Sequence, residues 1–142
     1  MTLSIRNQLP GTVTAITSGE VMATVGVRLT GGQNLTAAIT KEAVTDLGLA
    51  PGSPVRALVK STEVALATGP VEALSSLSIR NQLPGTVTTV ATGAAMASVK
   101  IAFGGVELTA AITKDAAAAL SLAAGTPVVA LIKSTEVSLA TA

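Results

Sequence analysis

The sequence contains no cysteine, histidine, tryptophan or tyrosine, and a single phenylalanine among its 142 residues. Without cysteine or histidine it cannot build a structural zinc site, a disulfide framework, haem or iron–sulfur ligation, or a Ser-His-Asp triad. One aromatic ring offers no stacking platform for single-stranded nucleic acid. The chemistry of this chain therefore has to rest on hydroxyls, amides, backbone groups and a few charged side chains.

Charge is scarce as well. Charged residues make up 12% of the chain, against roughly 25% in typical globular proteins. Nine Lys and Arg against eight Asp and Glu give a net charge of +1, so no global field attracts DNA or an anionic membrane. No uncharged apolar run approaches the ~20 residues of a membrane span, and the start of the chain lacks the apolar core of a signal peptide. We expect a cytoplasmic, soluble protein that hides part of its surface in an oligomer.

The chain is a tandem duplication, because three segments occur twice without change. The repeated segments are Ser4–Thr14 with Ser78–Thr88, Leu35–Lys41 with Leu108–Lys114, and Lys60–Val64 with Lys133–Val137. The offset falls from 74 to 73 residues at the Gly31-Gly32 and Gly104-Gly105 turns, which indicates one deletion in a hairpin. We predict two domains, residues 2–68 and 76–142, joined by a linker at 69–75.

Each copy is predicted to form three strands, a short helix and two more strands. In the first copy the expected strands are Thr12–Thr17, Val21–Leu29, Leu35–Ile39, Val55–Val59 and Glu63–Ala67. Thr40 is the predicted N-cap of the helix, and Gly48 is predicted to stop it. This order predicts an all-β fold with one short helix per repeat, arranged as two tandem OB-like five-stranded barrels.

The basic residues concentrate at repeated positions. Six of the nine are the pairs Arg6/Arg80, Lys41/Lys114 and Lys60/Lys133. Arg28, Arg56 and Lys100 have no basic counterpart and are interpreted as ordinary solvated residues. Ser4 precedes Arg6 by two residues, and Ser61 follows Lys60. With Thr40 at a helix start, these groups offer only donors and neutral acceptors, which suits a small, fully deprotonated oxyanion.

Structural interpretations of the same residues stay open. Arg6 could pair with Glu63 at a barrel mouth, and Thr40 could simply cap its helix. Lys60 beside Ser61 could be a Ser–Lys nucleophile, but neighbours on a strand point to opposite faces, which disfavours catalysis. No G-x-x-x-x-G-K-[ST] or G-x-G-x-x-G segment occurs, which argues against standard nucleotide loops.

The duplicated S-x-R-N-Q-L opening and K-S-T-E-V closing segment resemble the molbindin (Mop) family, in its two-domain form. The resemblance covers nearly the whole chain and implies OB-like barrels that bind molybdate or tungstate between subunits, with no organic cofactor and no metal-cation ligands. It also implies a homotrimer of two-domain chains. The oxyanion ligands that the resemblance implies are Ser4, Arg6, Asn7, Thr40, Val59 (backbone), Lys60 and Ser61, and in the second copy Ser78, Arg80, Asn81, Thr113, Ile132 (backbone), Lys133 and Ser134.

The residue chemistry and the resemblance lead to the same expectation. The chain is predicted to be a non-catalytic molybdate-binding protein for storage and homeostasis, with neither nucleic acid nor membrane as a partner. Arg6 and Lys60 are expected to serve one anion, reached from different chains across an interface. The alternatives are an OB-type single-stranded nucleic-acid-binding module and a purely structural oligomer.

Overall fold

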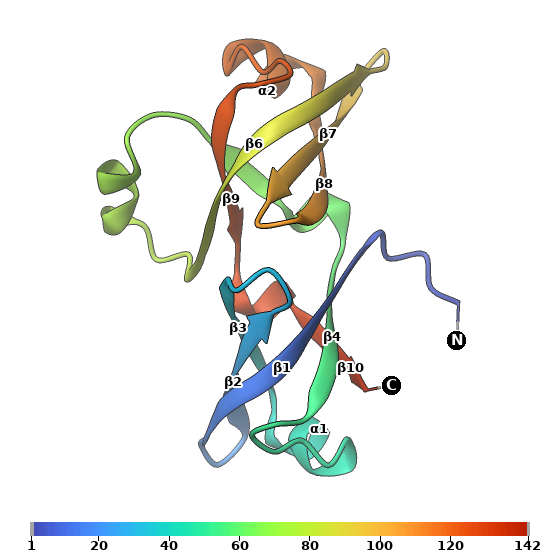
Figure 1. Cartoon of the computed structure of the whole chain (residues 1–142), viewed down its shortest axis with the longest axis vertical. Coiled ribbons are helices and arrows are strands. Elements are labelled where there is room, and N and C mark those ends of the chain that lie inside the picture. The colour runs from blue at the N-terminus through green and yellow to red at the C-terminus, as the bar shows by residue number, and fades with distance from the viewer. Residues whose placement is uncertain (1, 142) are drawn as a thin grey trace.

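The computed structural model describes residues 2–141 and contains two five-stranded sheets, each the wall of one barrel (Figure 1). Met1 and Ala142, the latter the end of the second predicted domain, lie outside the described residues. The first repeat contains β1 (Asn7–Ser18), β2 (Met22–Leu29), β3 (Asn34–Thr40), α1 (Lys41–Asp46), β4 (Pro54–Val59), the 3₁₀ helix η1 (Ser61–Glu63) and β5 (Ala65–Ala67). The second contains β6 (Asn81–Thr92), β7 (Met96–Phe103), β8 (Val106–Thr113), α2 (Lys114–Ala119), β9 (Pro127–Ile132), the 3₁₀ helix η3 (Ser134–Glu136) and β10 (Ser138–Thr141).

Period-two patterning places the strands as the sequence predicts. In β2 the buried residues Ala23, Val25, Val27 and Leu29 alternate with more exposed neighbours, so one face of the strand enters the core. In the first repeat, two strand bounds differ from the prediction by more than one residue. β1 starts at Asn7 instead of Thr12, because its first residues pair with β4. The fifth strand starts at Ala65, because the segment before it forms η1.

The short helix begins as predicted. The Thr40 hydroxyl accepts a hydrogen bond from the Ala43 N–H at 3.1 Å, which satisfies one of the free donors of the first turn. Gly48 follows the C-cap with φ of +62°, a left-handed conformation that glycine adopts without steric cost. No helix within residues 2–141 combines the length and apolar character needed to cross a bilayer.

The two repeats exchange their fifth strands. β10 of the second repeat pairs with β4 of the first, and β5 of the first repeat pairs with β9 of the second. In Figure 1, β10 accordingly lies beside β4 in the lower barrel. The prediction of five-stranded OB-like units with one helix each is confirmed, but the expectation that each repeat supplies all five of its own strands is wrong. Each barrel combines residues from both predicted ranges.

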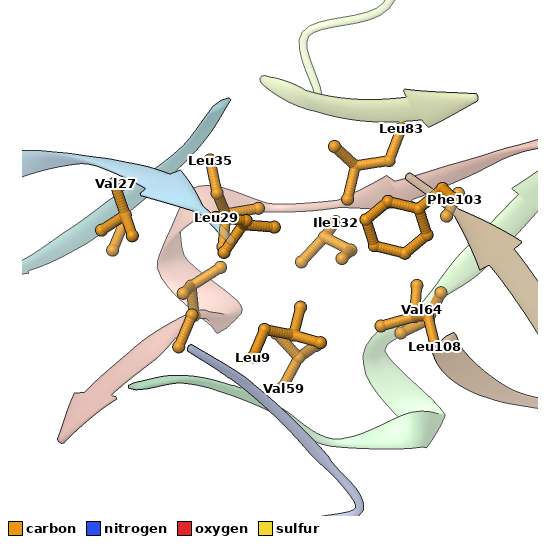
Figure 2. Close-up of a cluster of buried hydrophobic side chains, with 14 of the residues drawn as sticks. Leu9, Val27, Leu29, Leu35, Val59, Val64, Leu83, Phe103, Leu108 and Ile132 are labelled. Carbon is orange, nitrogen blue, oxygen red and sulfur yellow. The ribbon is translucent and has the colours of Figure 1, made fainter. Parts of the chain in front are cut away.

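The exchange fuses the two barrel interiors into one hydrophobic core. Val64 precedes β5 and is buried with Phe103 and Leu108 of the second repeat, whereas Leu9 and Val59 belong to the same cluster from the first (Figure 2). All five side chains are less than 5% exposed. Small barrels bury only about 60% of their unfolded surface, so a shared core offsets a deficit that one repeat would have alone.

The segment between the repeats is ordered. The predicted linker at 69–75 contains the 3₁₀ helix η2 (Val71–Ser76), whose Leu74 packs on Val129 and Leu131 of β9. The Leu74 carbonyl also accepts a hydrogen bond from the Gln82 side chain at 3.0 Å. This segment therefore covers part of the outer face of the second barrel.

The β2–β3 and β7–β8 hairpin tips touch each other at equivalent glycines. A Cβ on Gly31 would collide with the Gly104 carbonyl oxygen, and a Cβ on Gly104 would collide with the Gln33 side chain. The close approach of the two backbones therefore requires glycine at position 31, and the left-handed φ of +53° favours glycine at position 104.

Gly31→Ala is expected to lower the free energy of unfolding by about 1–3 kcal/mol, because the added methyl forces the two hairpins apart. Gly93→Ala is the matched control. Gly93 also lies in a hairpin turn, but a methyl there would meet only the Met96 carbonyl at 3.4 Å. Urea denaturation of both variants measures the difference. Equal stability of the two variants would contradict the contact between hairpin tips.

Candidate oxyanion-binding site

Strand register brings the two polar clusters of the first repeat together. β1 and β4 are antiparallel with Asn7 opposite Val59, so the residues just before β1 lie beside those just after β4. Ser4, Arg6, Lys60 and Ser61 consequently line one pocket of about 230 Å³. The two clusters are more than 50 residues apart in sequence, yet one chain is sufficient to unite them. A partner chain is therefore not needed to bring Arg6 to Lys60, contrary to the expectation from sequence.

The second repeat builds the same pocket from equivalent residues. Asn81 lies opposite Ile132, and this register places Arg80 beside Lys133. Together with Ser78 and Ser134, these residues line a pocket of about 200 Å³. Thr62 and its counterpart Thr135 also line the two pockets, and the sequence-based ligand set omitted both. Both threonines belong to the repeated K-S-T-E-V segment, and this repetition could have marked them as candidate ligands.

The pockets are rich in donors and lack carboxylates. Arg6 and Lys60 are exposed, and the lining of the first pocket includes no acidic side chain. Arg6 forms no ion pair with Glu63; within residues 2–141 the one ion pair is Lys100 with Glu107 at 3.8 Å. A guanidinium, an ammonium and hydroxyls in one cavity can neutralise and hydrogen-bond an anion that carries acceptors only.

The argument from strand geometry against a Ser–Lys pair does not hold. β4 ends at Val59, Lys60 is the N-cap residue of η1, and Ser61 is its first residue. Lys60 and Ser61 therefore do not alternate across a strand, and both line the same pocket. In a Ser–Lys pair the lysine itself is the base, which requires a buried, desolvated amine, whereas Lys60 is exposed.

The helix-start threonines occupy equivalent positions, Thr40 opposite Met22 and Thr113 opposite Met96, and neither lines the arginine–lysine pocket of its own repeat. Thr40 lines a pocket of about 440 Å³ with Lys41 and Glu20. Thr113 lines a groove of about 500 Å³ that also includes Lys133. Both hydroxyls accept from their helices, at 3.1 Å each, so each keeps its own hydrogen to donate to an anion.

Asn7 and Asn81 join the two repeats. The Asn7 side-chain N–H donates to the Thr109 carbonyl, and the Thr109 N–H donates back to Asn7 Oδ1, both at 2.8 Å. Asn81 makes the same pair with Thr36 at 2.8 Å. Both asparagines are at most 4% exposed. The structure gives them this joining role, and neither lines the Arg6–Lys60 or Arg80–Lys133 pocket.

Val59 and Ile132 lie at the ends of β4 and β9, directly before the pocket lysines. Their side chains are at most 1% exposed and belong to the core, so only their backbone groups could face an anion. Neither residue is among those that line the two pockets.

Two stretches of this chain, residues 3–66 and 77–139, each match the family model described as the TOBE domain. The chain belongs to the TOBE domain family. The tandem duplication seen in the sequence is thus a pair of TOBE domains, and the resemblance to Mop proteins is confirmed by relatives that carry that name.

Solved and curated relatives resemble this TOBE-domain pair over its whole length. The structure of the cytoplasmic molybdate-binding protein ModG, with molybdate bound, is 43% identical with a TM-score of 0.94, and the match covers 100% of both chains. The molybdenum-pterin-binding protein MopA of Rhodobacter capsulatus is 42% identical over 99% of this chain. That match covers 52% of MopA, so this chain spans about half the length of that relative.

A shorter relative matches a single TOBE domain. The molybdenum-pterin-binding protein 3 of Clostridium pasteurianum is 39% identical over 66 residues, which are 97% of its length and 46% of this chain. A protein that is essentially one repeat long therefore exists beside the duplicated form, which agrees with the duplication inferred from sequence.

Proposed function

We propose that this TOBE-domain pair binds molybdate or tungstate in the cytoplasm, for storage and homeostasis, and does not turn it over. The observation that carries the proposal is the duplicated pocket in which Arg6 and Lys60, or Arg80 and Lys133, converge with serine hydroxyls. Support comes from the molybdate-bound ModG structure, which this chain matches along its full length.

The chemistry of the pocket favours a fully deprotonated anion. Molybdate and tungstate present only acceptors, and every charged group in the pocket is a donor. Part of the phosphate in solution is protonated at neutral pH, and the P–OH group needs a hydrogen-bond acceptor. The pocket contains no carboxylate that could accept this hydrogen bond. We therefore expect phosphate to bind more weakly than molybdate. The single phenylalanine, Phe103, is 4% exposed, so it offers no ring on which a nucleic-acid base could stack.

We also propose that the chain forms a homotrimer in which a neighbouring copy completes each site. Neither Thr40 nor Thr113 lines the arginine–lysine pocket of its own repeat, so a second copy is one source of a helix start at each pocket. Val21 is 71% exposed and Met22 is 46% exposed, and Met22 lies opposite Thr40 in the sheet. An apolar surface beside Thr40 is suited to packing against another chain.

Purified protein from molybdate-fed cells is expected to contain molybdenum and to have a native mass of about three times the 13.9 kDa chain. Elemental analysis together with native mass spectrometry tests both parts. A particle of 13.9 kDa would contradict the trimer, and a trimer without molybdenum would indicate a purely structural oligomer. Hydrolytic activity that disappears in Ser61→Ala would contradict the absence of turnover.

A further inference from the structure

A third cationic pocket lies on the outer face of the first barrel and is not part of either oxyanion pocket. It has a volume of about 400 Å³, and its charged lining residues are Arg28 of β2 and Arg56 of β4. Arg28 pairs with Thr12 and Arg56 pairs with Pro10, on opposite sides of β1. Residues that pair across neighbouring strands point to the same face of the sheet. Pro10 and Thr12 are two residues apart on β1, so their side chains also point to one face. Both arginines therefore lie on one face, with Cα atoms about 12 Å apart.

The Arg56 side chain is held in position. It is half-buried, and its Nη1 donates to Gln8 Oε1 at 2.7 Å. Gln8 is fixed in turn, because its Nε2 donates to the Ile5 carbonyl at 3.2 Å. A guanidinium has five N–H donors, so four remain for a ligand. No carboxylate lines this pocket, and the ion pair found within residues 2–141 involves neither arginine.

The second repeat shows that the fold does not require these arginines. Ala102 occupies the position of Arg28, opposite Thr86, and Val129 occupies that of Arg56, opposite Pro84. Val129 is buried under Leu74 of η2, so that face of the second barrel is closed by an apolar contact. The chain has nine basic residues, and three of them have no basic counterpart in the other repeat. Two of these three line the same open pocket.

From this pocket we infer a binding site for a small organic phosphate monoester. Guanidinium groups bind phosphate oxygens through paired charge-assisted hydrogen bonds, and the exposed Thr12, which lines the same cavity, adds a hydroxyl donor. The Thr30 hydroxyl donates to the Pro10 carbonyl at 3.1 Å, so its hydrogen is already used. Pro10 and Pro54 supply apolar walls against which the organic part of the ester packs. The volume falls within the range of about 300–1,000 Å³ that is typical of small-molecule sites. This inference is independent of molybdate binding.

Phenyl phosphate is the probe, and isothermal titration of the full chain is the measurement. Wild type is expected to bind one phenyl phosphate per chain at this site. Arg28→Ala with Arg56→Val is expected to weaken that binding at least tenfold, while molybdate capacity stays unchanged. These substitutions install the residues that the second repeat carries at the same register, so the barrel is expected to fold normally, which circular dichroism confirms. Lys100→Ala, which removes the third unshared cation outside the pocket, is the matched control.

Inorganic phosphate and phenol separate the two halves of the ligand. Both are expected to bind at least tenfold more weakly than phenyl phosphate, because each uses only part of the pocket. Equal phenyl phosphate affinity in wild type and the double variant would overturn the site. Loss of phenyl phosphate binding in Arg6→Gln or Arg80→Gln would assign it to the oxyanion pockets instead. Phosphate that binds as tightly as phenyl phosphate would overturn the role of the apolar walls.

Discussion

Arg6→Gln is expected to abolish molybdate binding at the first-repeat pocket, with a loss of affinity of about 100-fold or more. Lys60→Gln is expected to have the same effect. In the proposed trimer a neighbouring copy covers this pocket, so a dianion there needs both cations for neutralisation, and removing either one leaves uncompensated charge away from water. Because both side chains line one pocket, the double variant is expected to be little worse than either single variant.

Calorimetric titration of the single and double variants measures this effect. Arg80→Gln and Lys133→Gln should remove the second-repeat sites and leave the first intact, because those residues line a separate pocket. Lys100→Gln is the charge-matched control outside both pockets and should bind molybdate as wild type does. Molybdate should also raise the melting temperature of wild type, less so in each site variant. Strictly additive losses, or full capacity in Arg6→Gln and Lys60→Gln, would show that the two residues do not share a ligand.

Asn7→Ala is expected to be among the most destabilising substitutions in the chain, at about 2–5 kcal/mol of unfolding free energy. It leaves the N–H and the carbonyl of Thr109 without their partner in a partly buried setting, and each such group costs about 1–3 kcal/mol. Asn7→Asp should be comparably harmful. It keeps an acceptor for the Thr109 N–H but turns a buried negative charge towards the Thr109 carbonyl.

Asn34→Ala provides the matched control for the asparagine variants. Asn34 is exposed in β3, and its loss should change stability by no more than about 0.5 kcal/mol. Chemical denaturation followed by circular dichroism compares the three variants. If Asn7→Ala were as stable as Asn34→Ala, the asparagine pair would not hold the two repeats together.

The strand positions could be predicted because each repeat carries strict alternation, as at Val25 and Val27 of β2. The exchange of β5 and β10 between the repeats could not be predicted from the sequence. Val64-Ala65-Leu66-Ala67 and Val137-Ser138-Leu139-Ala140 are nearly the same sequence, and β4 and β9 offer nearly the same apolar edge. Local pattern cannot decide between two chemically equivalent partners. The choice depends on the path of the chain through η1 and η3.

The site could be predicted from the sequence where it rests on repeated charge, whereas the contacts of Asn7 could not. Arg6 and Lys60 were identified from the duplication, and the β1–β4 register unites them. Asn7 belongs to the expected ligand set because the opening motif that resembles the Mop family contains it. Asn7 has the same parity as Leu9 and Val13, which are buried, and this parity indicates an inward side chain. Its partner, Thr109, is 102 residues away and beyond any local pattern.

The most direct test of the proposed function is a crystal structure of the molybdate-soaked protein with anomalous scattering recorded at the molybdenum absorption edge. The proposal predicts one anomalous peak within hydrogen-bonding distance of Arg6 and Lys60, and a second one beside Arg80 and Lys133. Peaks found only elsewhere on the chain, with both pockets empty at saturating molybdate, would contradict it.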